Sequence, residues 1–259
     1  HRALDRALCF WRHVYVAFIC CCCCLSRAVV LARPLFRRRR VCCLGGLFLG
    51  KQLAQLVALL CEARNDAARG LVGVHGVGKL LLCRLELLLE REDLEGGRVP
   101  LALELLQQLP DVDQIVVPIG GGGLITGISY AMKHLKPGVR IVGVMPEGSA
   151  VYAASRAAGM LVTLDSCASI ADAVVRKTGE PYLYPYIEEY VDDIVTVSED
   201  ELRKAIKLAC LYAKLTLEGA ASLALAAVTS GKCALTEQTV LLCSGGNIDG
   251  SVLLSCLQG

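Results

Sequence analysis

Four consecutive glycines, Gly120, Gly121, Gly122 and Gly123, have the composition of a phosphate-binding loop. Without Cβ atoms the backbone turns tightly and points several N–H groups at one anion. A helix that begins directly after the turn adds the partial positive charge of its N-terminus. The alternatives are an ordinary structural turn and a flexible linker, because glycine runs occur in both.

The segments that flank the glycines favour phosphate binding over a linker. The apolar residues 114–119 precede the glycines and are typical of a buried strand, and residues 124–135 have the pattern of a helix. A strand, a glycine loop and a helix in this order place the loop amides at a helix N-terminus, where anions bind.

A second polar loop follows a later apolar run. Residues 239–243 indicate a buried strand, and the chain continues Ser-Gly-Gly-Asn-Ile-Asp from Ser244 to Asp249. Loops at the carboxyl ends of parallel strands open at the same edge of a sheet, so we expect Ser244 to lie near the four glycines. A helix N-cap is the alternative role for Ser244 and is compatible with a ligand role.

The two loops together resemble those of the pyridoxal-phosphate enzymes of the threonine dehydratase and serine racemase family, which have the tryptophan-synthase-β fold. Three further segments resemble that family in the same order: Ser-Ile-Ala-Asp-Ala at residues 169–173, Tyr-Val-Asp-Asp-Ile-Val-Thr-Val-Ser-Glu at 190–199 and Leu-Glu-Gly-Ala-Ala at 217–221. The resemblance extends from about residue 97 to the end of the chain.

This resemblance implies pyridoxal 5′-phosphate as the cofactor and a set of residues around it. The implied cofactor-binding residues are Gly120, Gly121, Gly122, Gly123, Leu124, Ala173, Glu218 and Ser244. The glycines and Leu124 would hold the phosphate, Ser244 would face the ring nitrogen, and Ala173 and Glu218 would lie between them. A serine hydroxyl is too weak an acid to keep the ring nitrogen protonated, which favours β-elimination or racemisation over transamination. Ala173 replaces the usual glycine, so its methyl group would crowd the ring.

The catalytic Schiff-base lysine is not identifiable. Similar enzymes carry it in a Ser-Phe-Lys-x-Arg-Gly-Ala motif and hold the substrate carboxylate with a Ser-x-Gly-Asn-His loop, and residues 1–98 contain neither. Lys51 follows Phe-Leu-Gly but lies too close to Gly120 in the sequence to be assigned. Met145 stands where relatives with a divalent-cation site have a glutamate, and a thioether is a poor ligand for such a cation. We therefore expect no metal site.

Charge and cysteine content divide the chain into two unlike parts. Residues 1–98 carry 14 Arg, 2 Lys and 8 acidic residues, a net charge of +8, whereas residues 99–259 carry 4 Arg, 7 Lys and 17 acidic residues, a net charge of −6. Ten of the 15 cysteines lie in the first part, five of them consecutive at 20–24, a spacing unsuited to regular disulfides or one metal site. The scattered cysteines of the second part fit a reduced cytoplasmic protein.

Residues 1–98 contain several weak functional signals. The apolar residues 14–25 fall short of the roughly 20 that a membrane helix needs, and no clear signal-peptide cleavage site follows, so we expect no membrane partner. The arginines at 37–40 are more typical of a solvated tail than of a nucleic-acid surface. Gly73 to Lys79 matches the glycine-lysine core of a nucleotide-binding loop, but Leu80 replaces the Ser or Thr that contacts Mg²⁺.

The interpretation we favour for residues 1–98 is a frame-shifted or degenerate remnant. Residues 97–100, Gly-Arg-Val-Pro, occupy the register in which related enzymes have Gly-Gln-Gly-Thr. One back-translation of these residues restores the family sequence when a single base is inserted. We therefore leave residues 1–98 unassigned, assign residues 99–259 to the pyridoxal-phosphate-binding large domain, and expect the packed core in that second part.

The pattern of apolar runs predicts an α/β fold. The expected strands are residues 114–119, 140–145, 161–164, 194–197 and 239–243, and the expected helices are 101–109, 124–135, 149–159, 199–214 and 217–229. This order predicts an open, mostly parallel sheet with helices on both faces, preceded by an irregular N-terminal part.

The first functional hypothesis is an L-threonine or L-serine ammonia-lyase, or a serine racemase, that acts on a small hydroxy amino acid. The missing lysine motif would impair this activity. The alternatives are a non-catalytic fragment or pseudoenzyme and a nucleotide-binding module that uses Gly73 to Lys79. Nucleic acid is not an expected partner. Relatives usually form dimers or tetramers, so the question whether this chain forms a homo-oligomer stays open.

Overall fold

The computed structural model describes residues 14–19, 28–31 and 99–258. The chain divides into two compact units, and all the described residues belong to the one that comprises residues 1–33 and 93–259. The other unit, residues 34–92, lies outside the described residues, as do Lys51, the arginines at 37–40, the cysteines at 20–24 and the loop from Gly73 to Lys79. The predicted boundary at residue 98 stays a prediction.

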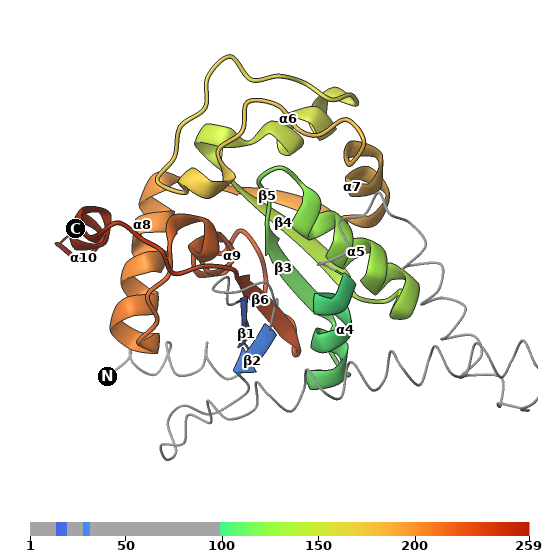
Figure 1. The fold of residues 1–259 in the computed structure, drawn as a ribbon, viewed down its shortest axis with the longest axis horizontal. Coiled ribbons are helices and arrows are strands. Elements are labelled where there is room, and N and C mark those ends of the chain that lie inside the picture. Colours follow the sequence, from blue (N-terminus) through green and yellow to red (C-terminus); the bar gives the residue numbers. More distant parts are fainter. Residues whose placement is uncertain (1–13, 20–27, 32–98, 259) are drawn as a thin grey trace, which may run out of the picture. The chain divides into compact units, whose positions relative to one another are not determined.

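The described part of the chain forms a six-stranded sheet in the order β2-β1-β6-β3-β4-β5 (Figure 1). The strands are β1 (Val14–Ile19), β2 (Ala28–Leu31), β3 (Gln114–Pro118), β4 (Arg140–Pro146), β5 (Asp193–Val197) and β6 (Thr239–Cys243). Neighbouring strands from β1 to β5 run parallel, and only β2 pairs antiparallel, at the edge. The predicted open, mostly parallel sheet is confirmed.

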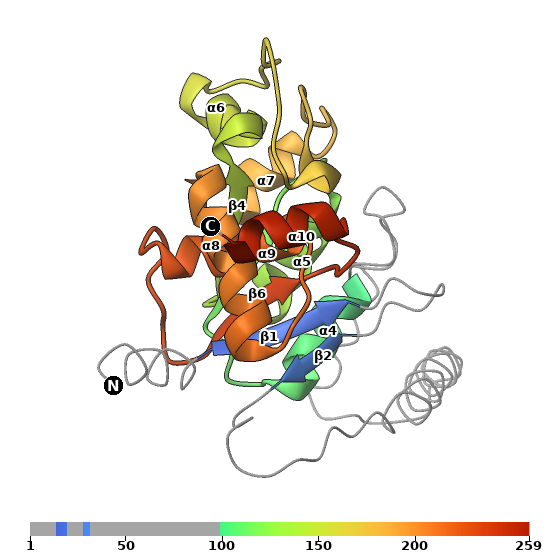
Figure 2. The same cartoon turned by 90° about the vertical axis from the view of Figure 1, so that its left-hand side faces the viewer.

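Helices cover both faces of this sheet. The helices are α4 (Val99–Gln108), α5 (Gly123–Leu135), α6 (Val151–Ala158), α7 (Tyr184–Tyr190), α8 (Glu199–Leu208), α9 (Gly219–Thr229) and α10 (Gly250–Gln258). The helices α4 and α5 lie on one face and α8 and α9 on the other (Figures 1 and 2). Helix α9 packs against β3, β4, β5 and β6, while α10 packs on α8.

The burial of the elements explains why these residues form them. The central strands β3 and β6 are buried at every position, as expected of parallel strands covered on both faces. Helix α9 is buried from Gly219 to Val228, and its small alanine side chains let it lie close to the sheet. Helix α8 begins with a capping box, in which the Ser198 hydroxyl accepts from the Glu201 amide and the Glu201 carboxylate accepts from the Ser198 amide.

The prediction of a strand at residues 161–164 is wrong. After α6 the chain turns at Gly159, which has a φ of 68°, and adds no strand to the sheet before β5. Thr163 then forms only an isolated bridge with Thr178. Leu161, Val162 and Leu164 are only partly buried, so the apolar pattern of this segment marks the margin of the molecule and not a core strand.

Other element boundaries also differ from the prediction. The expected helix at 199–214 ends as α8 at Leu208, continues as a π-helical turn (Ala209–Ala213) and stops at Lys214, whose φ is 58°. The helices α7 and α10 and the strands β1 and β2 were not predicted. Within the described residues, no helix combines the length and the apolar character needed to span a bilayer.

Candidate cofactor site

The glycine loop connects β3 to α5 and is shaped by close contacts. Gly122 has a φ of 97°, which favours glycine, and a Cβ there would lie 2.7 Å from the Tyr152 hydroxyl oxygen. A Cβ on Gly120 would lie 3.0 Å from the Cα of Val174. At Gly121, in contrast, an added Cβ would meet no atom within 4 Å. The loop is therefore packed on both sides of Gly121 and open at Gly121.

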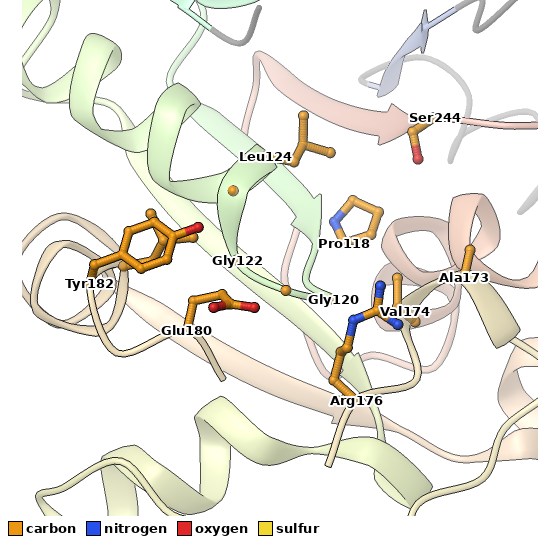
Figure 3. Close-up of a pocket in the computed structure, with 13 residues that line it drawn as sticks. Pro118, Gly120, Gly122, Leu124, Ala173, Val174, Arg176, Glu180, Tyr182 and Ser244 are labelled. Atoms are coloured by element: carbon orange, nitrogen blue, oxygen red, sulfur yellow. The ribbon is translucent and has the colours of Figure 1, made fainter. Parts of the chain in front are cut away.

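The open side of the loop faces a cavity of about 350 Å³ at the carboxyl ends of β3 and β6 (Figure 3). The lining residues are Pro118, Gly120, Gly121, Gly122, Gly123, Leu124, Ala173, Val174, Arg176, Glu180, Tyr182, Leu183 and Ser244. Seven of the eight residues implied by the resemblance thus lie around one cavity. Its volume is at the lower end of the range of about 300–1,000 Å³ that small-molecule sites occupy.

Ser244 directly follows β6, which runs parallel to β3. The parallel pairing brings Ser244 to the same sheet edge as the glycine loop, and its hydroxyl points into the cavity (Figure 3). The alternative role as a helix N-cap does not fit, because α10 begins only at Gly250. There the Asp249 carboxylate accepts a hydrogen bond from the Ser251 amide at 2.7 Å.

Glu218 is not among the lining residues, although the resemblance implied a place on the cavity wall. Its Oε2 atom accepts a hydrogen bond from the Asn247 amide at 3.1 Å, and its own amide donates to the Gly245 carbonyl at 3.2 Å. A Cβ on Gly245 would lie only 2.5 Å from its Oε1 atom. Glu218 therefore holds the loop that follows Ser244.

The segment that carries Ala173 is held by the first residue of α8. The Ser169 hydroxyl donates to Glu199 Oε1 at 2.5 Å, and the Ile170 amide donates to Glu199 Oε2 at 3.1 Å. These bonds fix the chain just before the short 3-10 helix η2 (Asp172–Val174). Ala173 lies in η2, is exposed and faces the cavity, where its methyl group reduces the free space.

The wall opposite the glycine loop was missed by the sequence analysis. Arg176, Glu180 and Tyr182 lie between η2 and α7, and their side chains extend toward the loop (Figure 3). No sequence motif marks these residues, because they belong to an irregular segment. Two of them carry opposite charges, which makes this wall polar.

Tyr152 connects this wall to the glycine loop. Its hydroxyl donates to the Gly121 carbonyl at 2.8 Å and accepts from the Glu180 amide at 2.9 Å. The side chain is fully buried, and burial raises the pKa of the Tyr152 hydroxyl, against a smaller lowering by the Glu180 amide. The hydroxyl therefore stays protonated near neutral pH and keeps both hydrogen bonds.

The residues around the cavity fit the phosphate and the ring of the cofactor. The open backbone at Gly121 and the N-terminus of α5 suit a phosphate, and Ser244 suits a ring nitrogen. No lysine is among the described residues that line the cavity. Met145 is fully buried in β4, and the described part of the chain has no cluster of three His, Cys, Asp or Glu side chains suited to a metal ion.

Known proteins match the part of the chain that builds this cavity. The serine racemase of Arabidopsis thaliana is 38% identical over 160 residues, which cover 60% of this chain and 48% of that protein. The catabolic L-threonine dehydratase of Escherichia coli K12 is 41% identical over 157 residues, again 60% of this chain and 48% of the relative. The chain thus spans about half the length of these relatives.

Solved structures show the same similarity. The threonine deaminase of T.th. has a TM-score of 0.57 and 35% identity, covering 59% of this chain and 58% of that one. Maize serine racemase has a TM-score of 0.57 and 33% identity, covering 62% and 51%. A family model for pyridoxal-phosphate dependent enzymes matches residues 90–245, more than half of the sequence. The chain therefore belongs to the family of pyridoxal-phosphate dependent enzymes.

Proposed function

We propose that this chain carries the cofactor-binding part of an L-threonine or L-serine ammonia-lyase, or of a serine racemase. The relatives named threonine dehydratase and serine racemase support the reaction class. The observation that carries the proposal is that the glycine loop and Ser244 line one cavity at the carboxyl ends of two adjacent parallel strands. The substrate in this proposal is a small hydroxy amino acid.

Each part of the cavity has a role in this proposal. The amides of the glycine loop and the N-terminus of α5 bind the cofactor phosphate. The Leu124 amide belongs to the same phosphate-binding loop. Ser244 would orient the ring by a hydrogen bond to its nitrogen, and Ala173 would limit the space around the ring. When bound, pyridoxal phosphate supplies an electron sink that favours removal of the substrate α-proton. Glu218 and Glu199 act as positioning residues, because they hold the loops that bear Ser244 and Ala173.

A second candidate is a non-catalytic cofactor-binding product. The observation that favours it is the absence of a lysine among the described lining residues, together with the absence of the lysine motif from residues 1–98. Complete turnover requires a lysine to exchange protons with the substrate. We therefore propose that this chain binds the cofactor without completing the reaction. A nucleotide-binding role of Gly73 to Lys79 is the weakest alternative.

The described cysteines agree with a cytoplasmic location in this proposal. Among the described residues the cysteines are all free: Cys167, Cys210, Cys233, Cys243 and Cys256. Burial raises the pKa of the Cys233 and Cys243 thiols, so both stay neutral and unreactive near pH 7.

The experiment that tests the proposal titrates the purified chain with pyridoxal phosphate to measure binding, then reduces the sample with borohydride and maps the labelled peptides. The same preparation is assayed with L-threonine and L-serine for 2-oxo acid and ammonia. We expect saturable cofactor binding without a stoichiometric adduct on one lysine and without turnover. A single labelled lysine with product formation would identify the catalytic residue and reject the non-catalytic candidate. No saturable binding would reject the cofactor-site proposal itself.

A further inference from the structure

Arg176 is the one arginine or lysine among the described residues that line the cavity. Its side chain extends toward the glycine loop from the opposite wall (Figure 3). The Nη1 atom donates to the Val175 carbonyl at 2.9 Å. The ion pairs found among the described residues, within 4.0 Å, involve Lys133, Arg140, Arg156 and Lys232, and none involves Arg176. The guanidinium therefore keeps donors for a ligand.

The neighbouring charged side chains differ from Arg176 in direction or in sign. Lys177 is not among the residues that line the cavity. Its Nζ atom instead donates a hydrogen bond to the Asp165 carbonyl at 3.0 Å. Glu180 lines the same wall as Arg176 and also points toward the glycine loop (Figure 3). The cavity thus has one cationic and one anionic side chain opposite the loop, and no charged side chain in the loop itself.

We propose that Arg176 binds the phosphate group that the glycine loop holds, and that Glu180 opposes this binding. This inference rests on the proposed cofactor site. A glycine loop offers only amide donors and the partial charge of a helix terminus, whereas a guanidinium adds a full charge and a planar pair of donors that match phosphate oxygens. The nearby carboxylate repels a dianion, so the two side chains change phosphate affinity in opposite directions.

The ligand that Arg176 recognises in this proposal is an oxyanion, and a substrate carboxylate has similar chemistry. The test therefore separates the two sources. Pyridoxine 5′-phosphate has the ring and the phosphate but no aldehyde, so it cannot react with lysines. Unphosphorylated pyridoxine lacks the phosphate, inorganic phosphate lacks the ring, and L-serine offers only the carboxylate.

The measurement is the Kd of each compound for the full chain by titration calorimetry, at low and at physiological salt. Arg176→Gln is expected to raise the Kd of pyridoxine 5′-phosphate and of inorganic phosphate about fivefold, as for a charge-assisted bond in a partly exposed site. Glu180→Gln is expected to lower both Kd values. Lys177→Gln removes a positive charge from the adjacent position and serves as the matched control, with no expected change.

Opposite effects of the two cavity variants exclude a folding defect as the cause, because a damaged site would weaken binding in both. An unchanged Kd in Arg176→Gln, or an equal loss in Lys177→Gln, would overturn the role of Arg176 and leave the cofactor site intact. A loss of affinity for L-serine alone would also overturn it and would assign the anion to a carboxylate. If the unaltered chain binds neither pyridoxine 5′-phosphate nor inorganic phosphate, the cofactor-site proposal fails as well.

Discussion

The hydroxyl of Tyr152 donates a hydrogen bond to the carbonyl of Gly121 at 2.8 Å, so a buried side chain on α6 holds the glycine loop. The same hydroxyl accepts from the Glu180 amide, so one atom connects the two walls of the cavity. The Tyr152 side chain itself is fully buried, so its hydroxyl is held in place between these two partners.

Tyr152→Phe is expected to destabilise the fold by about 1–3 kcal/mol, since two hydrogen bonds worth about 0.5–1.5 kcal/mol each are lost. The affinity for pyridoxine 5′-phosphate should fall with it, because the loop is less fixed. Urea unfolding and calorimetric titration measure the two effects. Tyr212→Phe is the matched control, because Tyr212 is 56% exposed. Equal unfolding free energies for the two variants would show that the Tyr152 hydroxyl does not hold the loop.

A second prediction concerns the contact between Gly245 and Glu218. Gly245→Ala places a methyl group 2.5 Å from the Glu218 carboxylate, a distance that requires one of them to move. We expect a loss of about 0.5–1.5 kcal/mol of unfolding free energy, because the flexible Glu218 side chain moves and gives up its hydrogen bond with the Asn247 amide. In a Glu218→Ala background the same change should cost much less. A double-mutant cycle measured by urea unfolding gives the coupling, and additive effects would contradict the contact.

The central strands could be predicted from the sequence because each is a short apolar run between turn residues. Strands β3, β4, β5 and β6 begin and end within one residue of their predicted bounds. The position of Ser244 followed from the parallel pairing, since a loop after a strand has to open at the carboxyl edge. Local sequence was sufficient for these features.

The opposite wall of the cavity could not be predicted in the same way. The direction of the Arg176 side chain depends on how an irregular segment packs against Tyr152, which lies more than twenty residues earlier in the chain. Glu218 precedes a helix, and its carboxylate could have faced the cavity or the loop behind it. The pairing of β1 with β6 joins segments more than two hundred residues apart, a contact that local apolar patterns do not reveal.

The buried thiol of Cys243 predicts a dependence of stability on alkaline pH. Burial raises the pKa of this thiol from 9.0 to about 12, so the native state keeps a proton that the unfolded chain loses. The contribution of the protonated thiol to the unfolding free energy is fully present below pH 9 and is lost as the pH rises toward 12. The unfolding free energy falls by on the order of 4 kcal/mol over this pH range.

Cys243→Val removes the titrating group and should flatten this decline. The check is urea unfolding at several values above pH 9, comparing the variant with the unaltered chain. Cys167→Val, at a partly buried position, is the control and should keep the steep decline. Parallel pH profiles for the unaltered chain and Cys243→Val would count against the buried thiol as the cause.

Ser244 should contribute to the binding of the cofactor ring and not to the binding of its phosphate. Ser244→Ala is expected to raise the Kd of pyridoxine 5′-phosphate about three- to tenfold, the value of one hydrogen bond, and to leave the Kd of inorganic phosphate unchanged. Ser255→Ala, on α10 and outside the cavity, provides the control. If the affinity for inorganic phosphate falls equally, the hydroxyl lies at the phosphate end of the site.

The most direct test of the cofactor site is a titration of the ¹⁵N-labelled chain with pyridoxine 5′-phosphate, followed by amide NMR shifts. We expect saturable shifts at Gly121, Gly122, Gly123 and Leu124 and, with the same Kd, at Ser244. Inorganic phosphate should move the loop amides and leave Ser244 largely unmoved. Shifts confined to other parts of the chain, or loop and Ser244 shifts with different Kd values, would contradict a single site formed by the glycine loop and Ser244.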